Sequence, residues 1–256
     1  RDSRDSGPVV SCGAVRARLL EGPYRTRPRK FRFPRRGDSK DGSLASGPGT
    51  VSGPPAVVFD LDGVLVDSEP AIRLSVDTAL SGIDERPVTD EEIRSIIGPP
   101  LLDGFMSLMA GRGGPVDVAP RLLEAYRAHY AIHSVANTRL YPGIAESLVL
   151  MQEAGIRLAI ATSKPIQFTL PILDGLGVDD CFQVVAAPGA GSVAEGKTET
   201  LGRAVQRLEL ESARVVPMVG DRGPDMEAAV AHGLVPVGAL WGYGSHAELV
   251  AAGALR

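Results

Sequence analysis

Two acidic residues close together follow an apolar run near position 60. The run reads Ala-Val-Val-Phe-Asp-Leu over residues 56–61, and Asp62 and Gly63 come directly after it. It is typical of a strand buried on both faces, and residues two apart on a strand project to the same side. We therefore expect Asp60 and Asp62 to emerge together at the carboxyl edge of a sheet, where open α/β folds bind ligands. Gly63 permits a sharp turn there.

A second acidic pair, Asp221 and Asp225, follows a later apolar run over residues 215–219. If the two strands are neighbours, all four carboxylates meet in one crevice. Carboxylates that lie close together repel one another unless a cation or proton separates them, and Mg²⁺ prefers carboxylates together with phosphate oxygens. The pattern therefore predicts a site suited to magnesium, although Asp225 alone would also suit the cap of a following helix.

Similar apolar runs recur along the chain, starting near Arg157, Gln183, Val215 and Leu234. Helical patterns lie between the later runs, for example from Lys197 to Leu210. Alternation of this kind predicts an α/β fold with a doubly wound, parallel, Rossmann-like sheet. We expect its core to comprise residues 55–67 and 141–256.

Residues 68–140 lie between the first two predicted strands, and they are far more than one crossover connection needs. The stretch Thr89-Asp90-Glu91-Glu92 has the sequence of a capping box, which starts a helix. Further helical patterns begin near Ser68, Leu101 and Ala119. This interval is therefore expected to be an inserted α-helical cap domain.

The first 54 residues differ from the rest in composition and charge. They are rich in Arg, Pro, Gly and Ser without a regular period, so we expect a disordered basic tail. Residues 1–50 hold 12 Lys+Arg and 5 Asp+Glu, which leaves 15 and 26 for the remainder, a net charge of −11. This acidic balance argues against a nucleic-acid surface on the core.

The sequence contains no feature that calls for a membrane or an oxidising compartment. No apolar stretch approaches the roughly 18 to 20 residues that span a bilayer. Cys12 and Cys181 have neither metal-ligand nor redox spacing, and Cys181 is expected to be a packed thiol. A cytoplasmic monomer or homodimer is the default expectation.

Four segments, in chain order, resemble the signature motifs of the haloacid dehalogenase superfamily on its phosphatase side. They are residues 60–68, the stretch Thr162-Ser163-Lys164-Pro165, the basic residue Lys197, and residues 220–225. The likeness covers residues 56–253 and is similar in detail to bacterial phosphoglycolate-phosphatase-type hydrolases with a helical cap.

The resemblance implies a role for each matched residue. Asp60 would attack phosphorus and form an aspartyl-phosphate, and Asp62 would protonate the leaving oxygen and then activate water. Thr162 and Lys197 would hold the phosphoryl oxygens. The implied Mg²⁺ ligands are Asp60, the main-chain carbonyl of Asp62, Asp221 and Asp225. Residues implied to contact a small phosphorylated metabolite are Leu61, Gly63, Ser163, Pro99 and Leu101.

Two other residues near these motifs need an interpretation. Lys164 competes with Lys197 for the cationic role, and its position in the second motif favours Lys197. Arg222 stands where many relatives have a small residue, and we expect it to face solvent or to pair with Asp225.

Several functions remain open on this fold. Asp62 argues against dehalogenation, which has no leaving oxygen to protonate, and the absence of lysine between Asp67 and Tyr141 argues against phosphonate chemistry. A phosphatase is the favoured function. A sugar-phosphate mutase uses the same two aspartates and stays an alternative, and a non-catalytic binding protein is a lesser one.

Overall fold

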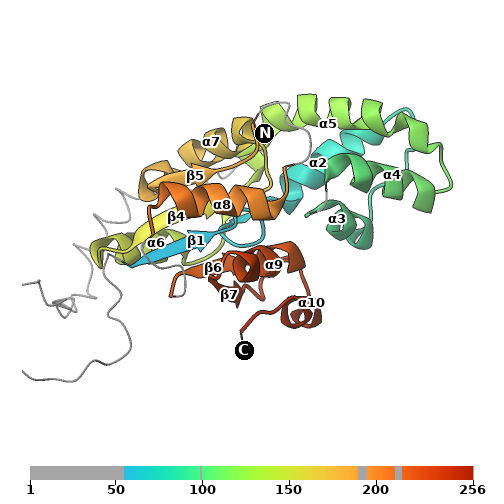
Figure 1. The fold of residues 1–256 in the computed structure, drawn as a ribbon. Coiled ribbons are helices and arrows are strands. Elements are labelled where there is room, and N and C mark those ends of the chain that lie inside the picture. Colours follow the sequence, from blue (N-terminus) through green and yellow to red (C-terminus); the bar gives the residue numbers. More distant parts are fainter. Residues whose placement is uncertain (1–54, 99, 190–194, 211–214, 256) are drawn as a thin grey trace, which may run out of the picture.

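The computed structural model describes residues 55–98, 100–189, 195–210 and 215–255. The predicted tail, residues 1–54, and the predicted substrate contact Pro99 lie outside this range. Five parallel strands form one sheet in the order β5-β4-β1-β6-β7 (Figure 1). In chain order they are β1 (Ala56–Phe59), β4 (Arg157–Ala161), β5 (Val184–Ala186), β6 (Pro217–Gly220) and β7 (Val235–Gly238).

Helices cover both faces of this sheet. Phe59 packs with α6 (Ile144–Glu153) and α7 (Ile166–Gly175), whereas its neighbour Val58 packs with α8 (Lys197–Arg207) and α9 (Gly223–Ala231). Successive strand residues therefore enter opposite apolar layers, which explains why the predicted strands read as continuous apolar runs. The predicted doubly wound parallel sheet is confirmed.

Four further helices lie between β1 and β4 and extend from one end of the sheet (Figure 1). Their side chains, among them Ile93, Phe105 and Leu122, form a separate apolar cluster that also includes Phe168 of α7. The helices are α2 (Glu69–Leu80), α3 (Asp90–Ile96), α4 (Leu101–Gly111) and α5 (Ala119–His133). The predicted capping box of α3 is present, since Thr89 and Glu92 exchange hydrogen bonds at 3.2 and 2.8 Å.

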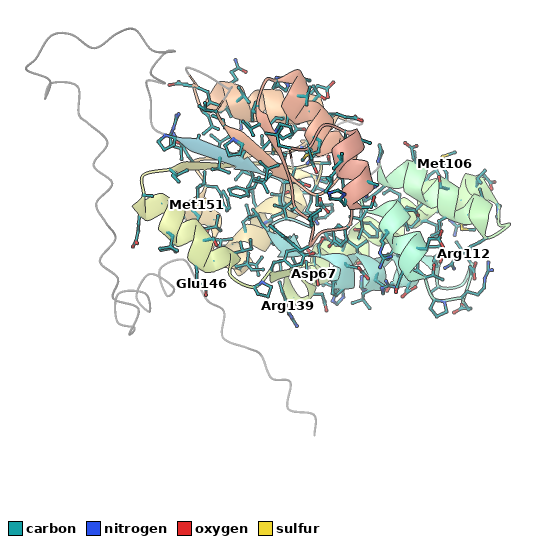
Figure 2. All side chains as sticks on the ribbon, turned by 90° about the horizontal axis from the view of Figure 1, so that it is seen from below. Asp67, Met106, Arg112, Arg139, Glu146 and Met151 are labelled. Atoms are coloured by element: carbon teal, nitrogen blue, oxygen red, sulfur yellow. The ribbon has the colours of Figure 1, made fainter. Side chains whose placement is uncertain are left out.

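A short antiparallel pair of strands marks where the chain enters and leaves this helical part. Val66 pairs with Leu140 and Asp67 with Arg139, in strands β2 (Val66–Asp67) and β3 (Arg139–Leu140). Figure 2 shows Asp67 and Arg139 at this junction. The sequence did not predict this pair, and the exact boundaries of a cap domain, residues 68–140, remain a proposal.

The remaining elements are short. The 3-10 turns are η1 (Val116–Val118), η2 (Val135–Asn137) and η3 (Asp179–Cys181), and the last helix is α10 (His246–Ala251). Cys181 is buried as expected, but it is disulfide-bonded, so the expectation of a thiol is wrong. Among the described residues, no helix is long and apolar enough to cross a membrane.

One buried arginine organises the turn between α2 and α3. The Arg112 side chain is 4% exposed and donates to both carboxylate oxygens of Glu92, at 2.8 and 2.7 Å. It also donates to the main-chain carbonyls of Arg86 and Pro87. Figure 2 shows Arg112 in the helical part, far from Asp67. Arg112 therefore holds this turn against the end of α4 without touching the sheet.

Replacing Arg112 by Met should destabilise the fold by roughly 2 to 3 kcal/mol, because charged hydrogen bonds to one carboxylate and two main-chain carbonyls are lost together. Urea unfolding followed by circular dichroism measures the change. The matched control is Arg94→Met, which alters an exposed arginine of α3 and should cost less than about 0.5 kcal/mol. Equal losses in the two variants would contradict the role given to Arg112.

Candidate active site

The site begins where β1 and β6 end side by side. Phe59 lies opposite Val219 in the parallel register, and the main-chain N–H of Asp60 donates to the Val219 carbonyl at 2.9 Å. The next residues of each strand, Asp60 and Asp221, consequently meet at the carboxyl edge of the sheet. This confirms the predicted neighbourhood of the two strands, which is what brings the acidic pairs together.

The turn after β1 leaves no room for a side chain. Gly63 has φ of +75°, and a Cβ there would lie 2.1 Å from Oδ2 of Asp221. Glycine is therefore required both by the backbone conformation and by the close approach of the carboxylate.

Three carboxylates form one buried cluster. Oxygens of Asp60, Asp221 and Asp225 lie within 4.8 Å of one another, and all three residues are buried. Lys197 Nζ pairs with Oδ1 of Asp60 at 2.7 Å and with Oδ1 of Asp225 at 2.8 Å. If all three carboxylates are ionised, one ammonium leaves a net charge of −2, and a cluster with that charge attracts a cation.

One carboxylate oxygen of Asp221 is buried without a hydrogen bond among the described residues. Its Oδ2 accepts from the main-chain N–H of Tyr243 at 2.7 Å, but Oδ1 is buried and has no hydrogen-bond partner among the described residues. Burial, followed by the charge of Asp60, raises the pKa of Asp221 to about 8. Burial also raises the pKa of Asp60 to about 6, against the opposing effect of Lys197. An unsatisfied carboxylate oxygen beside two others fits Mg²⁺, which prefers hard oxygen ligands.

Asp225 belongs to the acidic cluster and also caps a helix. Its Oδ2 accepts from the main-chain N–H groups of Asp221 and Arg222, at 3.1 and 3.0 Å, and so caps α9. Its Oδ1 meanwhile contacts Lys197 within the acidic cluster. The helix cap and the cluster thus use different oxygens of one carboxylate.

Asp62 is held apart from the three-carboxylate cluster by a second lysine. Its Oδ1 lies 2.9 Å from Lys164 Nζ, and its carboxylate is not among those within 4.8 Å of one another. Burial alone would lower the pKa of Lys164, but Asp62 and Tyr130 outweigh burial and raise it. Lys164 and Lys197 therefore do not compete for one position, because each serves a different aspartate.

The other predicted site residues are placed in different ways. Thr162 is buried at the end of β4, and its Oγ1 accepts from the main-chain N–H of Lys164 at 3.2 Å. Ser163 is exposed, whereas the side chain of Leu61 is fully buried in the sheet core. Leu101 is partly buried against the apolar cluster of the helical part.

Arg222 corrects both interpretations made from the sequence. Its Nε pairs with Oε1 of Glu248 at 3.0 Å, and its Nη1 donates to the carbonyl of Ile97, before α4. It neither faces solvent alone nor pairs its side chain with Asp225. Arg222 links the fourth motif to the loop that precedes α4, and Glu248, which the sequence did not single out, holds it there.

The loop after β7 closes over the first turn. Trp241 Nε1 donates to the Val64 carbonyl at 3.1 Å, and Tyr243 OH accepts from the N–H groups of Ser68 and Glu69. This loop therefore joins the acidic cluster to the start of α2.

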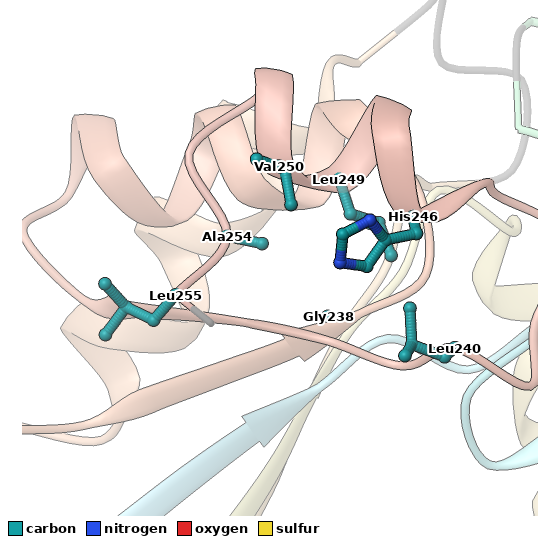
Figure 3. Close-up of a pocket in the computed structure, with 7 residues that line it drawn as sticks. All are labelled: Gly238, Leu240, His246, Leu249, Val250, Ala254 and Leu255. Carbon is teal, nitrogen blue, oxygen red and sulfur yellow. The ribbon is translucent and has the colours of Figure 1, made fainter.

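A separate hollow of about 600 Å³ lies between β7 and α10 (Figure 3). Its lining is mainly apolar and shares no residue with the acidic cluster. It is formed by Gly238, Leu240, His246, Leu249, Val250, Ala254 and Leu255.

Known proteins are similar to this chain in sequence and fold. The Tyrosine-protein kinase PtkA of Mycobacterium tuberculosis is 36% identical over 201 residues, which cover 78% of this chain and 66% of that protein. This chain thus matches just under two thirds of that relative's length. The Phosphoglycolate phosphatase of Colwellia psychrerythraea is 32% identical over 194 residues, 73% of this chain and 84% of that protein.

A solved structure has the same arrangement. A putative phosphatase from Clostridium difficile superposes with a TM-score of 0.70 at 30% identity, over 78% of this chain and 92% of that chain. Residues 57–239 match the family described as haloacid dehalogenase-like hydrolase, and this range contains every aspartate of the site. The chain belongs to the haloacid dehalogenase-like hydrolase family.

Proposed function

We propose that this chain is a magnesium-dependent phosphatase that hydrolyses a small phosphomonoester through an aspartyl-phosphate on Asp60. The name of one relative, Phosphoglycolate phosphatase, supports the substrate class. The main support for the proposal is that Asp60 and Asp62 pair with two different lysines. Asp60 lies in the cluster with Lys197, while Asp62 is separately paired with Lys164. A nucleophile and an acid/base thus have distinct surroundings within one turn of chain.

In the first step, a carboxylate oxygen of Asp60 forms a bond to phosphorus and the bond from phosphorus to the leaving oxygen breaks. Asp62 gives its proton to that oxygen, and the alcohol departs. In the second step, water gives a proton to Asp62 and attacks the same phosphorus. Inorganic phosphate leaves with the water oxygen, and the carboxylate of Asp60 is restored.

Mg²⁺ would be bound by Asp60, Asp221 and the main-chain carbonyl of Asp62, with Asp225 nearby. When bound, it neutralises phosphoryl charge, on which phosphoryl transfer depends. Lys197, held between Asp60 and Asp225, would contact a phosphoryl oxygen from the protein side, together with the hydroxyl of Thr162. These cations allow a carboxylate to approach a phosphate dianion.

Asp60→Asn should lower kcat for phosphate release by at least about 1000-fold, because the amide cannot form the acyl phosphate. The measurement is phosphate release in Mg²⁺ from phosphoglycolate, sugar phosphates and nucleoside monophosphates. Asp103→Asn, an exposed aspartate of α4, is the matched control and should keep wild-type turnover. Substantial turnover by Asp60→Asn would refute the nucleophile.

Adding Mg²⁺ to metal-free protein should raise the melting temperature by about 3 °C or more, because an ion bound to the native state stabilises it by mass action. Asp221→Asn should remove this shift, yet melt no lower than metal-free wild type because one buried like charge is gone. Differential scanning fluorimetry with and without EDTA measures both effects. An undiminished Mg²⁺ shift in Asp221→Asn would argue against the site.

A second candidate function is transfer of phosphate to protein tyrosine, because one relative at 36% identity bears the name of a tyrosine kinase. Kinase activity needs a nucleoside triphosphate donor and labels protein, whereas the proposed phosphatase releases free phosphate. We expect release from monoesters and no labelling of tyrosine from γ-labelled ATP. Label on tyrosine without monoester hydrolysis would favour the kinase, and stimulation by a sugar bisphosphate would favour a mutase.

A further inference from the structure

Lys164 is a buried cation that the proposed chemistry does not use. It follows β4 in the second motif, and its side chain is 7% exposed. Its Nζ lies 2.9 Å from Oδ1 of Asp62 and donates to the hydroxyl of Tyr130 at 2.5 Å. The same Nζ stands 4.7 Å from the centroid of the Tyr130 ring, within the range of a cation–π contact.

The partner on the other side, Tyr130, belongs to the helical part. It lies on α5, is 1% exposed, and stacks on Tyr126 with ring centroids 5.2 Å apart. The Tyr130 and Phe168 rings form a T-shaped pair with centroids 5.4 Å apart, and Phe168 belongs to α7. The Tyr126 ring forms a similar pair with Phe105 of α4, with centroids 5.8 Å apart. This row of aromatic rings fixes the Tyr130 hydroxyl relative to the sheet.

Lys164 consequently connects three segments that are distant in sequence: the turn after β1, the loop after β4, and helix α5. Among the described residues, Lys164 is the ion-pair partner of the Asp62 carboxylate. A carboxylate on a short turn has free rotation about its side-chain bonds, and ordering it has an entropic cost. A lysine anchored by an aromatic hydroxyl restricts that rotation.

We propose that Lys164 is a positioning residue, which, held by Tyr130 of α5, aims the Asp62 carboxylate at the leaving oxygen of the substrate. This rests on the proposed function, because it assigns proton transfer to Asp62. Lys164 thereby makes protonation of the leaving group depend on the docking of the helical part against the sheet. Lys197 takes no part in this, since it contacts Asp60 and Asp225.

The test compares two esters that differ in their need for a proton. An alkyl alkoxide leaves poorly unless it is protonated, whereas p-nitrophenolate leaves as a stable anion. The alkyl substrate is the phosphomonoester of the above panel that wild type turns over fastest, and the aryl substrate is p-nitrophenyl phosphate. The value of kcat/KM is compared because it reports the steps up to departure of the leaving group.

Lys164→Met should lower kcat/KM for the alkyl ester by about 100-fold and for p-nitrophenyl phosphate by less than about 5-fold, following the usual contribution of general acid catalysis. Lys164→Arg, which keeps the charge, should recover at least about 10-fold on the alkyl ester. Tyr130→Phe, which keeps the ring but removes the hydroxyl, should show a selective loss of about 10-fold. Arg127→Met, which removes an exposed basic side chain of α5, is the control and should show no loss.

Equal losses on both esters in Lys164→Met would overturn the inference, because the lysine would then act on the phosphoryl group or on folding. If Lys164→Met does not fold by circular dichroism, Tyr130→Phe decides, and equal losses there overturn the inference as well. A wild-type chain that hydrolyses neither ester would overturn the proposed function, and the inference with it. The two failures are therefore distinguishable.

Discussion

The crowding of three buried carboxylates at one edge of the sheet is the constraint on which the rest of the site depends. Asp60, Asp221 and Asp225 lie within 4.8 Å with a single lysine between two of them. Like charges buried together oppose folding unless a cation compensates. Such an arrangement persists only where the surrounding fold over-determines it, and here two adjacent parallel strands fix both chain segments.

The crowding around these carboxylates also requires glycine at two positions in the neighbouring loops. A Cβ at Gly242 would lie 2.4 Å from Asp221 and 2.5 Å from the carbonyl of Gly63, and Gly63 itself has no room for a Cβ. The two turns therefore pack backbone against carboxylate. This close packing removes water from the acids, which is the first cause of the raised pKa of Asp60 and Asp221.

Sequence patterns predicted the sheet because both its faces are apolar, so strands appear as unbroken runs ending in acids. They predicted the acidic cluster because strand ends share one edge. They could not predict which lysine pairs with which aspartate, since Lys164 and Lys197 follow different strands and only the three-dimensional path resolves their partners.

Pro171 lies inside α7, although proline usually breaks a helix interior. The neighbouring side chains of Ile172 and Leu173 are fully buried, and their packing outweighs the cost of the proline.

Tyr130 was equally inaccessible from sequence, because its contact with Lys164 spans 34 positions and crosses from a helix to a strand end. The two aspartates also differ in exposure: the side chain of Asp62 is 18% exposed and that of Asp60 is 11%. In the proposed mechanism, Asp62 takes a proton from the attacking water in the second step, so water must reach its carboxylate, whereas a nucleophile gains from dry surroundings. Under the proposed function, the contact of Asp62 with Lys164, which in turn donates to Tyr130 of α5, would couple departure of the leaving group to the helical part.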